Sequence, residues 1–101
     1  MEWMEIIRLR TQPGEEKPII DWLSDYAEKI SATPGIRKTT VYSRAIVPGD
    51  VSIHIHWDAP GNSLSESEVG LMAAEALKKY GILDHTVWLA IGKNAQVKKK
   101  G

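Results

Sequence analysis

Residues 51–58 (VSIHIHWD) alternate strictly between apolar and polar side chains. Successive side chains of a strand point to opposite faces, so Ile53, Ile55 and Trp57 share one face of a predicted strand. His54 and His56 lie on the other face, together with Ser52 and Asp58. A strand of this kind is either a solvated strand or the wall of a polar cavity. The pattern therefore indicates the face on which any chemistry would lie.

The remaining periodicity predicts three further strands and two helices. Strands are expected at residues 2–10, 36–47 and 86–91, and apolar residues recur at helical spacing over residues 15–30 and 65–80. The pair Pro48-Gly49 is typical of a type II turn, which would join two strands as a hairpin.

The ends of the second predicted helix carry signals of their own. The sequence SESE at residues 65–68 indicates a capping box, in which the helix would begin at Ser65. Gly81 is expected to end the helix as a left-handed cap.

The order β-α-β-β-α-β predicts an α+β domain of ferredoxin-like type. Its four-stranded antiparallel sheet would have the order 4-1-3-2, with both helices on one face. We assign residues 1–92 to this single domain and residues 93–101, with their run of three lysines, to a basic C-terminal tail.

This arrangement leaves one face of the sheet open. Strand alternation sends the apolar side chains Ile7, Leu9, Val41, Ile53, Ile55, Trp57, Val87, Leu89 and Ile91 to the helix side. The open side receives a mixture of apolar, aromatic and basic residues: Met4, Ile6, Arg8, Thr40, Tyr42, His54, His56 and Trp88. A face of this composition is typical of an interface or a cavity, so we predict a homodimer that forms through it.

Composition excludes several classes of protein. The 101 residues suit one domain, and the 13 Lys and Arg balance the 13 Asp and Glu, so the basic footprint of a nucleic-acid binder is missing. There is no cysteine, which removes disulfides and thiolate metal sites. No export signal or membrane-spanning stretch is evident, and we expect no membrane partner and a cytoplasmic location.

The chain resembles the dimeric α/β-barrel proteins, in particular the antibiotic-biosynthesis-monooxygenase-like domains. The matching features are the element order, the Pro34-Gly35 pair before the second strand, and the His-x-His strand that ends in Trp57-Asp58. The resemblance covers roughly residues 3 to 91. It implies two sheets paired into a barrel and a small molecule bound between sheet and helices; some members oxidise polycyclic phenols without a cofactor, and others degrade haem.

Two departures from this pattern narrow what the resemblance implies. Haem-degrading relatives carry a histidine on the second helix, whereas residues 65–80 contain none, so haem is disfavoured. We expect the protein to use no cofactor, as the cofactor-free members of the family do. The aromatic lining of the cofactor-free oxygenases is only partly present, because the chain has no phenylalanine.

The predicted functional residues lie mainly on the open face. We expect a pocket bounded by Arg8, Tyr42, His54, His56 and Trp88, in which a histidine accepts a proton from a phenolic or quinone-type molecule and Arg8 holds the resulting anion. His54, His56 and Arg8 are the candidate catalytic residues. The candidate substrate-binding residues are Tyr42, Trp88, Asn62 and Trp57.

Other interpretations remain open at this point. His54, His56 and His85 are the three imidazoles that a metal site would use, but we expect no bound metal because one strand does not bring His85 within reach. Arg8 would equally pair with an intersubunit carboxylate such as Glu5 or Asp58. The histidines would then only make hydrogen bonds within the dimer interface. The protein would be a non-enzymatic dimeric interaction or ligand-sensing protein.

Overall fold

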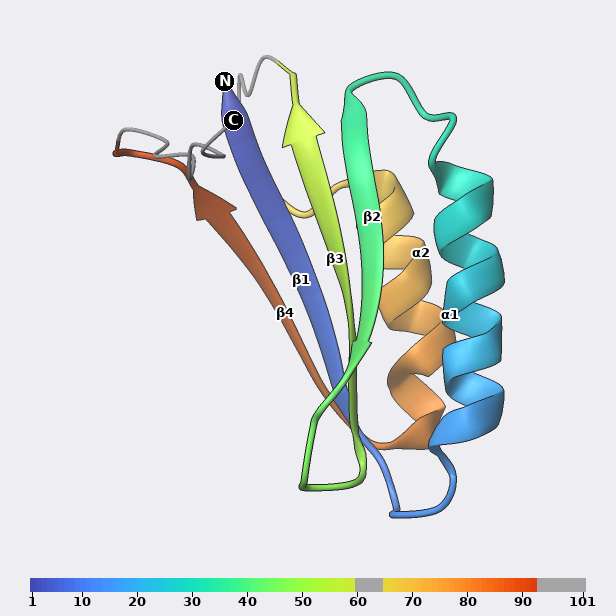
Figure 1. Cartoon of the computed structure of the whole chain (residues 1–101). Helices are drawn as coiled ribbons and strands as arrows, with labels where there is room; N and C mark the ends of the chain where they lie inside the picture. Colours follow the sequence, from blue (N-terminus) through green and yellow to red (C-terminus); the bar gives the residue numbers. More distant parts are fainter. Residues whose placement is uncertain (60–64, 93–101) are drawn as a thin grey trace, which may run out of the picture.

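The computed structural model describes residues 1–59 and 65–92. Its elements follow the predicted order: β1 (Glu2–Arg10), α1 (Glu16–Ile30), β2 (Ile36–Ser43), β3 (Asp50–Asp58), α2 (Glu68–Leu77), the short 3-10 helix η1 (Lys78–Tyr80) and β4 (Ile82–Leu89). The strands form one antiparallel sheet in the order β2-β3-β1-β4. Figure 1 shows both helices on the same face of this sheet. The ferredoxin-like α+β fold predicted from the sequence is confirmed.

The core lies between the sheet and the two helices. Ile7 and Leu9 of β1 and Ile53 and Ile55 of β3 are fully buried there. From α1, the residues at helical spacing contribute one continuous apolar stripe: Ile19, Leu23, Ala27 and Ile30. The division of β1 and β3 into a helix side and an open side is therefore the predicted one.

The β2–β3 hairpin forms as expected, but β2 is shorter than predicted. It ends at Ser43 and not at Val47, because Val47 N–H donates to Ala45 O in a tight turn, with Ile46 at a φ of 74°. Gly49 has a φ of 107°, and a Cβ there would lie 2.7 Å from Thr11 O, so this position requires glycine.

The last strand is displaced toward the N-terminus from its predicted position. It spans Ile82–Leu89 and not residues 86–91, and Ile91, which we expected on the helix side, is 92% exposed. Gly81 is not a left-handed cap either, because its φ of 161° is extended backbone. Glycine is needed there for a close approach, since a Cβ would lie 2.0 Å from Arg10 O.

The second helix begins later than the capping-box pattern predicted. Its N-cap is Ser67, whose hydroxyl accepts a hydrogen bond from Gly70 N–H at 3.0 Å, and the α-helical part ends at Leu77 before η1. No helix in the described part of the chain is long and apolar enough to cross a membrane. The cytoplasmic location stays a prediction, and the predicted basic tail, residues 93–101, lies outside the described residues.

The position of the cap can be tested with two serine variants. Ser67→Ala should lower the free energy of unfolding by about 1 kcal/mol, because it leaves the Gly70 N–H without its acceptor. Ser65→Ala, the matched control at the position the sequence favoured, should change stability by less than about 0.5 kcal/mol. Urea unfolding of the two variants measures both values, and equal losses would contradict the assignment.

Candidate functional site

Strand pairing arranges the predicted site residues in rows across the open face. Ser52 of β3 pairs with both Tyr42 and Arg8. In the row that contains the second histidine, Met4 pairs with both His56 and Trp88. Arg8, Tyr42, His54, His56 and Trp88 therefore share one face, as predicted.

The contacts on this face are few and partly exposed. The Tyr42 ring meets the His54 ring edge-on, with centroids 4.6 Å apart, while the Tyr42 residue remains 47% exposed. Arg8 lies 3.9 Å from the Asp84 carboxylate, and both side chains are more than half exposed, so this pair contributes little in water. Trp88 is 57% exposed and donates from Nε1 to Thr86 Oγ1 at 2.8 Å.

Both open-face histidines resist protonation. Burial, and then the neighbouring His56, lower the pKa of His54. Burial, and then the positive charges of Lys38 and Arg37, lower the pKa of His56, with a smaller opposing effect of Glu2. A neutral imidazole costs less to bury than a charged one, so these histidines suit a face that a second protein surface would cover.

The two remaining predicted site residues do not join this group. Trp57 lies on the helix side of the sheet and is 8% exposed, so the sheet separates it from the open-face residues. Asn62 lies outside the described residues. His85 also lies on the helix side, opposite His54 and His56, and no three metal-ligating side chains cluster within residues 1–59 and 65–92.

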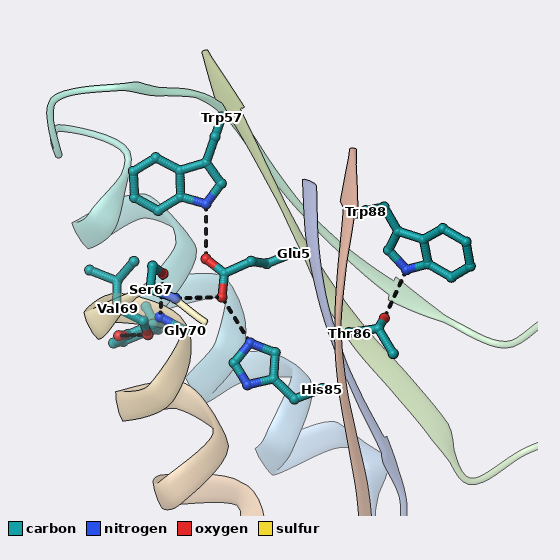
Figure 2. Close-up of polar contacts among 9 residues, drawn as sticks. Glu5, Trp57, Ser67, Val69, Gly70, His85, Thr86 and Trp88 are labelled. Atoms are coloured by element: carbon teal, nitrogen blue, oxygen red, sulfur yellow. Dashed lines mark hydrogen bonds and ion pairs between the residues drawn. The ribbon is translucent and has the colours of Figure 1, made fainter. Parts of the chain in front are cut away.

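A second polar cluster, which sequence reasoning did not assemble, lies on the helix side around Glu5. Glu5 is fully buried, yet its carboxylate is surrounded by donors, as Figure 2 shows. Its Oε1 accepts from Trp57 Nε1 at 2.9 Å. Its Oε2 accepts from Ser67 N at 3.0 Å and lies 2.8 Å from His85 Nε2. We call Glu5, Trp57, Ser67 and His85 the Glu5 cluster.

The local sequence explains how these groups converge. Glu5 stands at an inward position of β1 and pairs with Ile55 on one side and Val87 on the other. Two of its donors therefore come from the flanking strands β3 and β4, and the third comes from the N-terminus of α2. Gly70 makes the approach of α2 possible, because a Cβ there would lie 2.3 Å from Glu5 Oε2.

The contact with Glu5 indicates which nitrogen of the His85 ring carries a hydrogen. An ionised carboxylate only accepts hydrogen bonds, so Nε2 of His85 carries a hydrogen when Glu5 is ionised. In the neutral ring, Nδ1 is then the acceptor. Figure 2 shows this second nitrogen turned away from Glu5, and no described residue bonds to it.

Aromatic side chains surround the cluster. The Trp3 and Trp57 rings stack at 5.0 Å with planes 6° apart. Trp3 Nε1 is buried and no described residue accepts from it, which is unusual for a buried donor. Tyr26 donates to Val69 O at 2.6 Å; burial, and then the charge of Glu5, raise the pKa of Tyr26, so it keeps its proton.

A surface cleft lies on the same side of the sheet as the cluster, although no residue of the cluster lines it. It has a volume of about 440 Å³ and runs between α2 and the edge strand β4, with Leu71, Ala74 and Leu83 among its lining residues. Leu83 precedes His85 by two residues on the same face of β4. The Cα atom of Leu83 is therefore about 7 Å from the Cα atom of His85 along the strand.

One signal in the sequence could have revealed this cluster. The inward positions of β1 are Trp3, Glu5, Ile7 and Leu9, so alternation alone places a carboxylate in the core. The alternative pairing of Arg8 with Glu5 of another subunit does not fit the structure, because Glu5 is fully buried on the helix side. A charged residue at an inward strand position requires buried partners, and these come from residues 52 to 80 positions away, beyond the reach of local patterns.

Comparison with solved structures gives the same fold. A candidate antibiotic biosynthesis monooxygenase from Deinococcus radiodurans superposes with a TM-score of 0.72 at 20% identity, over 96% of this chain and 99% of that one. Rv0793 from Mycobacterium tuberculosis gives a TM-score of 0.70 at 14% identity, over 94% of this chain and all of the other.

A third structure in this group carries a described activity. It is a variant of SnoaB from Streptomyces nogalater, a cofactor-independent oxygenase, with a TM-score of 0.68 at 15% identity over 94% of this chain and 98% of that one. No protein-family model and no curated protein sequence matches the chain. The comparisons support the fold expected from the resemblance to the monooxygenase-like domains.

The open-face histidines predict a specific pH dependence. Because the pKa values of His54 and His56 are lowered in the folded protein, the unfolded chain binds more protons below about pH 6.5. The melting temperature should therefore fall as the pH is lowered from about 7 to about 5. The double variant His54→Gln/His56→Gln should show a smaller fall when both proteins are followed by circular dichroism.

The pH range separates this effect from that of a buried carboxylate. Hydrogen bonds from Arg10 and Arg44 lower the pKa of Asp50, so its stabilising contribution is lost only under more acidic conditions. An unchanged slope of melting temperature against pH in the double variant would show that the two histidines do not cause the effect.

Proposed function

We propose that the protein is a homodimeric, small-molecule-binding enzyme that oxidises a phenolic or quinol-type substrate with dioxygen and without a cofactor. Its substrate site is the Glu5 cluster on the helix side, and the residues predicted on the open face form the dimer interface. Structural relatives named as monooxygenases, one of them a cofactor-independent oxygenase, support the reaction class.

The observation that carries this proposal is the fully buried carboxylate of Glu5 in contact with an imidazole. A buried ionic network often contributes no more to stability than well-packed apolar side chains of similar volume. Such a network between sheet and helices, next to a stacked pair of indoles, is therefore a candidate for function.

The overall reaction balances without any further reactant. A hydroxyarene and dioxygen give a quinone and water. One oxygen atom enters the ring, and the other leaves as water with two hydrogens of the substrate. The substrate supplies all the electrons for this reaction, so neither a flavin nor a metal is required.

The composition of the open face supports the proposed dimer. Its central residues Met4 and Ile6 are only partly buried, and Trp88 is largely exposed. A second copy packed face to face would cover these side chains and His54 and His56, whose resistance to protonation suits burial. The substrate site and the interface would then lie on opposite faces of the same strands.

Turnover tests the reaction class directly. With 1-naphthol as the probe, an oxygen electrode should record uptake of one dioxygen per naphthol oxidised, and ¹⁸O-labelled dioxygen should place one labelled atom in the product. Gly70→Ala should reduce turnover on the order of tenfold or more, because its methyl group displaces the Glu5 carboxylate.

Gly92→Ala is the matched control, since a Cβ at Gly92 meets no atom within 4 Å. This variant should retain the wild-type rate. Saturable binding of naphthol without oxygen uptake by any of the three proteins would support the non-enzymatic, ligand-sensing alternative and reject the proposed activity.

Light scattering tests the dimer. The wild-type protein should have twice the 11.3 kDa chain mass at micromolar concentration. Ile6→Glu and Trp88→Glu should shift the mass to that of one chain, because each would bury an unpaired charge at a cost of several kcal/mol. Met72→Glu, on an exposed part of α2, should leave the dimer intact. A monomeric wild-type protein would contradict the proposed interface.

A further inference from the structure

The Glu5 cluster has the geometry of an oriented proton acceptor. His85 is held by Glu5 at 2.8 Å through one ring nitrogen, and its side chain is 10% exposed, so the ring is enclosed without being sealed. The carboxylate that holds it is itself fixed by Trp57 Nε1 and by the backbone of Ser67. A base whose orientation is set by a second, fixed group is typical of sites that abstract a proton.

We propose that His85 is the catalytic proton acceptor of this site through Nδ1 and that Glu5 is its positioning residue. This inference rests on the proposed function and names the residues that perform its first step. A hydroxyarene bound against the partly exposed His85 ring transfers its hydroxyl proton to Nδ1. The O–H bond breaks, the electron pair stays on oxygen, and the new N–H bond leaves an imidazolium paired with the Glu5 carboxylate.

The role of Glu5 follows from donor and acceptor matching. Its carboxylate meets three donors, and it stabilises the imidazolium that forms beside it. In Glu5→Gln, the amide nitrogen can take the place of either carboxylate oxygen. In the place of Oε2 it faces Ser67 N–H and His85, and in the place of Oε1 it faces Trp57 Nε1–H. When the amide nitrogen faces His85, Nε2 must accept, the hydrogen moves to Nδ1, and the base is lost.

The open-face histidines are less suited to this step. Tyr42 contacts His54 through ring packing, and the charged neighbours of His56 are Lys38, Arg37 and Glu2. Neither histidine has a buried carboxylate within hydrogen-bonding distance among the described residues. An imidazole without such a partner lacks a group that selects its tautomer and stabilises its charged form.

The tautomer of His85 can be observed without any substrate. Two-bond ¹H–¹⁵N correlation spectra resolve the ring nitrogens of the three histidines, and the signal lost in His85→Asn assigns His85. We expect hydrogen on Nε2 and a bare Nδ1 in the wild-type protein. Hydrogen on Nδ1, in either a neutral or a doubly protonated ring, would overturn the proposal.

Ionisation of a bound probe tests the proton transfer and is independent of oxidation. Under anaerobic conditions at pH 7, free 1-naphthol is neutral, and its anion is recognised by its shifted absorption. Bound to the wild-type protein, a substantial fraction should be naphtholate. Glu5→Gln and His85→Asn should lower that fraction about tenfold or more, with naphthol affinity changed by less than about threefold.

The matched control is Glu66→Gln, an exposed carboxylate next to Ser67, which should leave the naphtholate fraction unchanged. Failure of naphthol to bind, or a naphtholate signal that persists in His85→Asn, would overturn the assignment. If Glu5→Gln does not fold, the tautomer of His85 in the wild-type protein and the naphtholate fraction in His85→Asn still test the proposal. Naphtholate formation without later oxygen uptake in air would retain the acceptor and reject only the proposed oxidation.

Discussion

A carboxylate with no access to water, that of Glu5, is the constraint on which this end of the structure depends. An isolated buried carboxylate is too costly to keep ionised, so its position is tolerated only where donors surround it. Here the donors come from β3, from β4 and from the start of α2. The single charge therefore joins four elements that are distant in the sequence, and it does so where Gly70 lets the helix approach.

The same requirement explains several features that would otherwise be unrelated. Ser67 begins α2 where its backbone N–H reaches Glu5, while its hydroxyl caps the helix through Gly70. Trp57 turns its indole nitrogen inward and stacks on Trp3. The late start of α2 thus depends on the buried carboxylate of Glu5. A capping motif in the neighbouring sequence does not reveal this long-range contact.

Sequence patterns predicted the fold well because strands and helices report their faces locally. Alternation placed Ile53, Ile55 and Trp57 against the helices, and the Pro48-Gly49 pair located the hairpin. Strand ends were less accurate, since β4 begins at Ile82 through pairing with Arg10, a long-range contact. The Glu5 cluster was missed for a related reason: alternation placed the carboxylate inward, but its partners lie on three other elements.

Alternation along the central strands also has a chemical consequence. In β3, His56 faces the open side while its neighbour Trp57 faces Glu5, and in β1 Met4 and Ile6 flank Glu5 in the same way. Packing a second copy on the open face would therefore restrict the same backbone segments that hold the carboxylate and the indole. Because a one-residue slip of either strand would exchange the two sets of side chains, interface and site constrain the same register. Dimer packing on the open face of the sheet would thus help to hold the oriented base on the helix side.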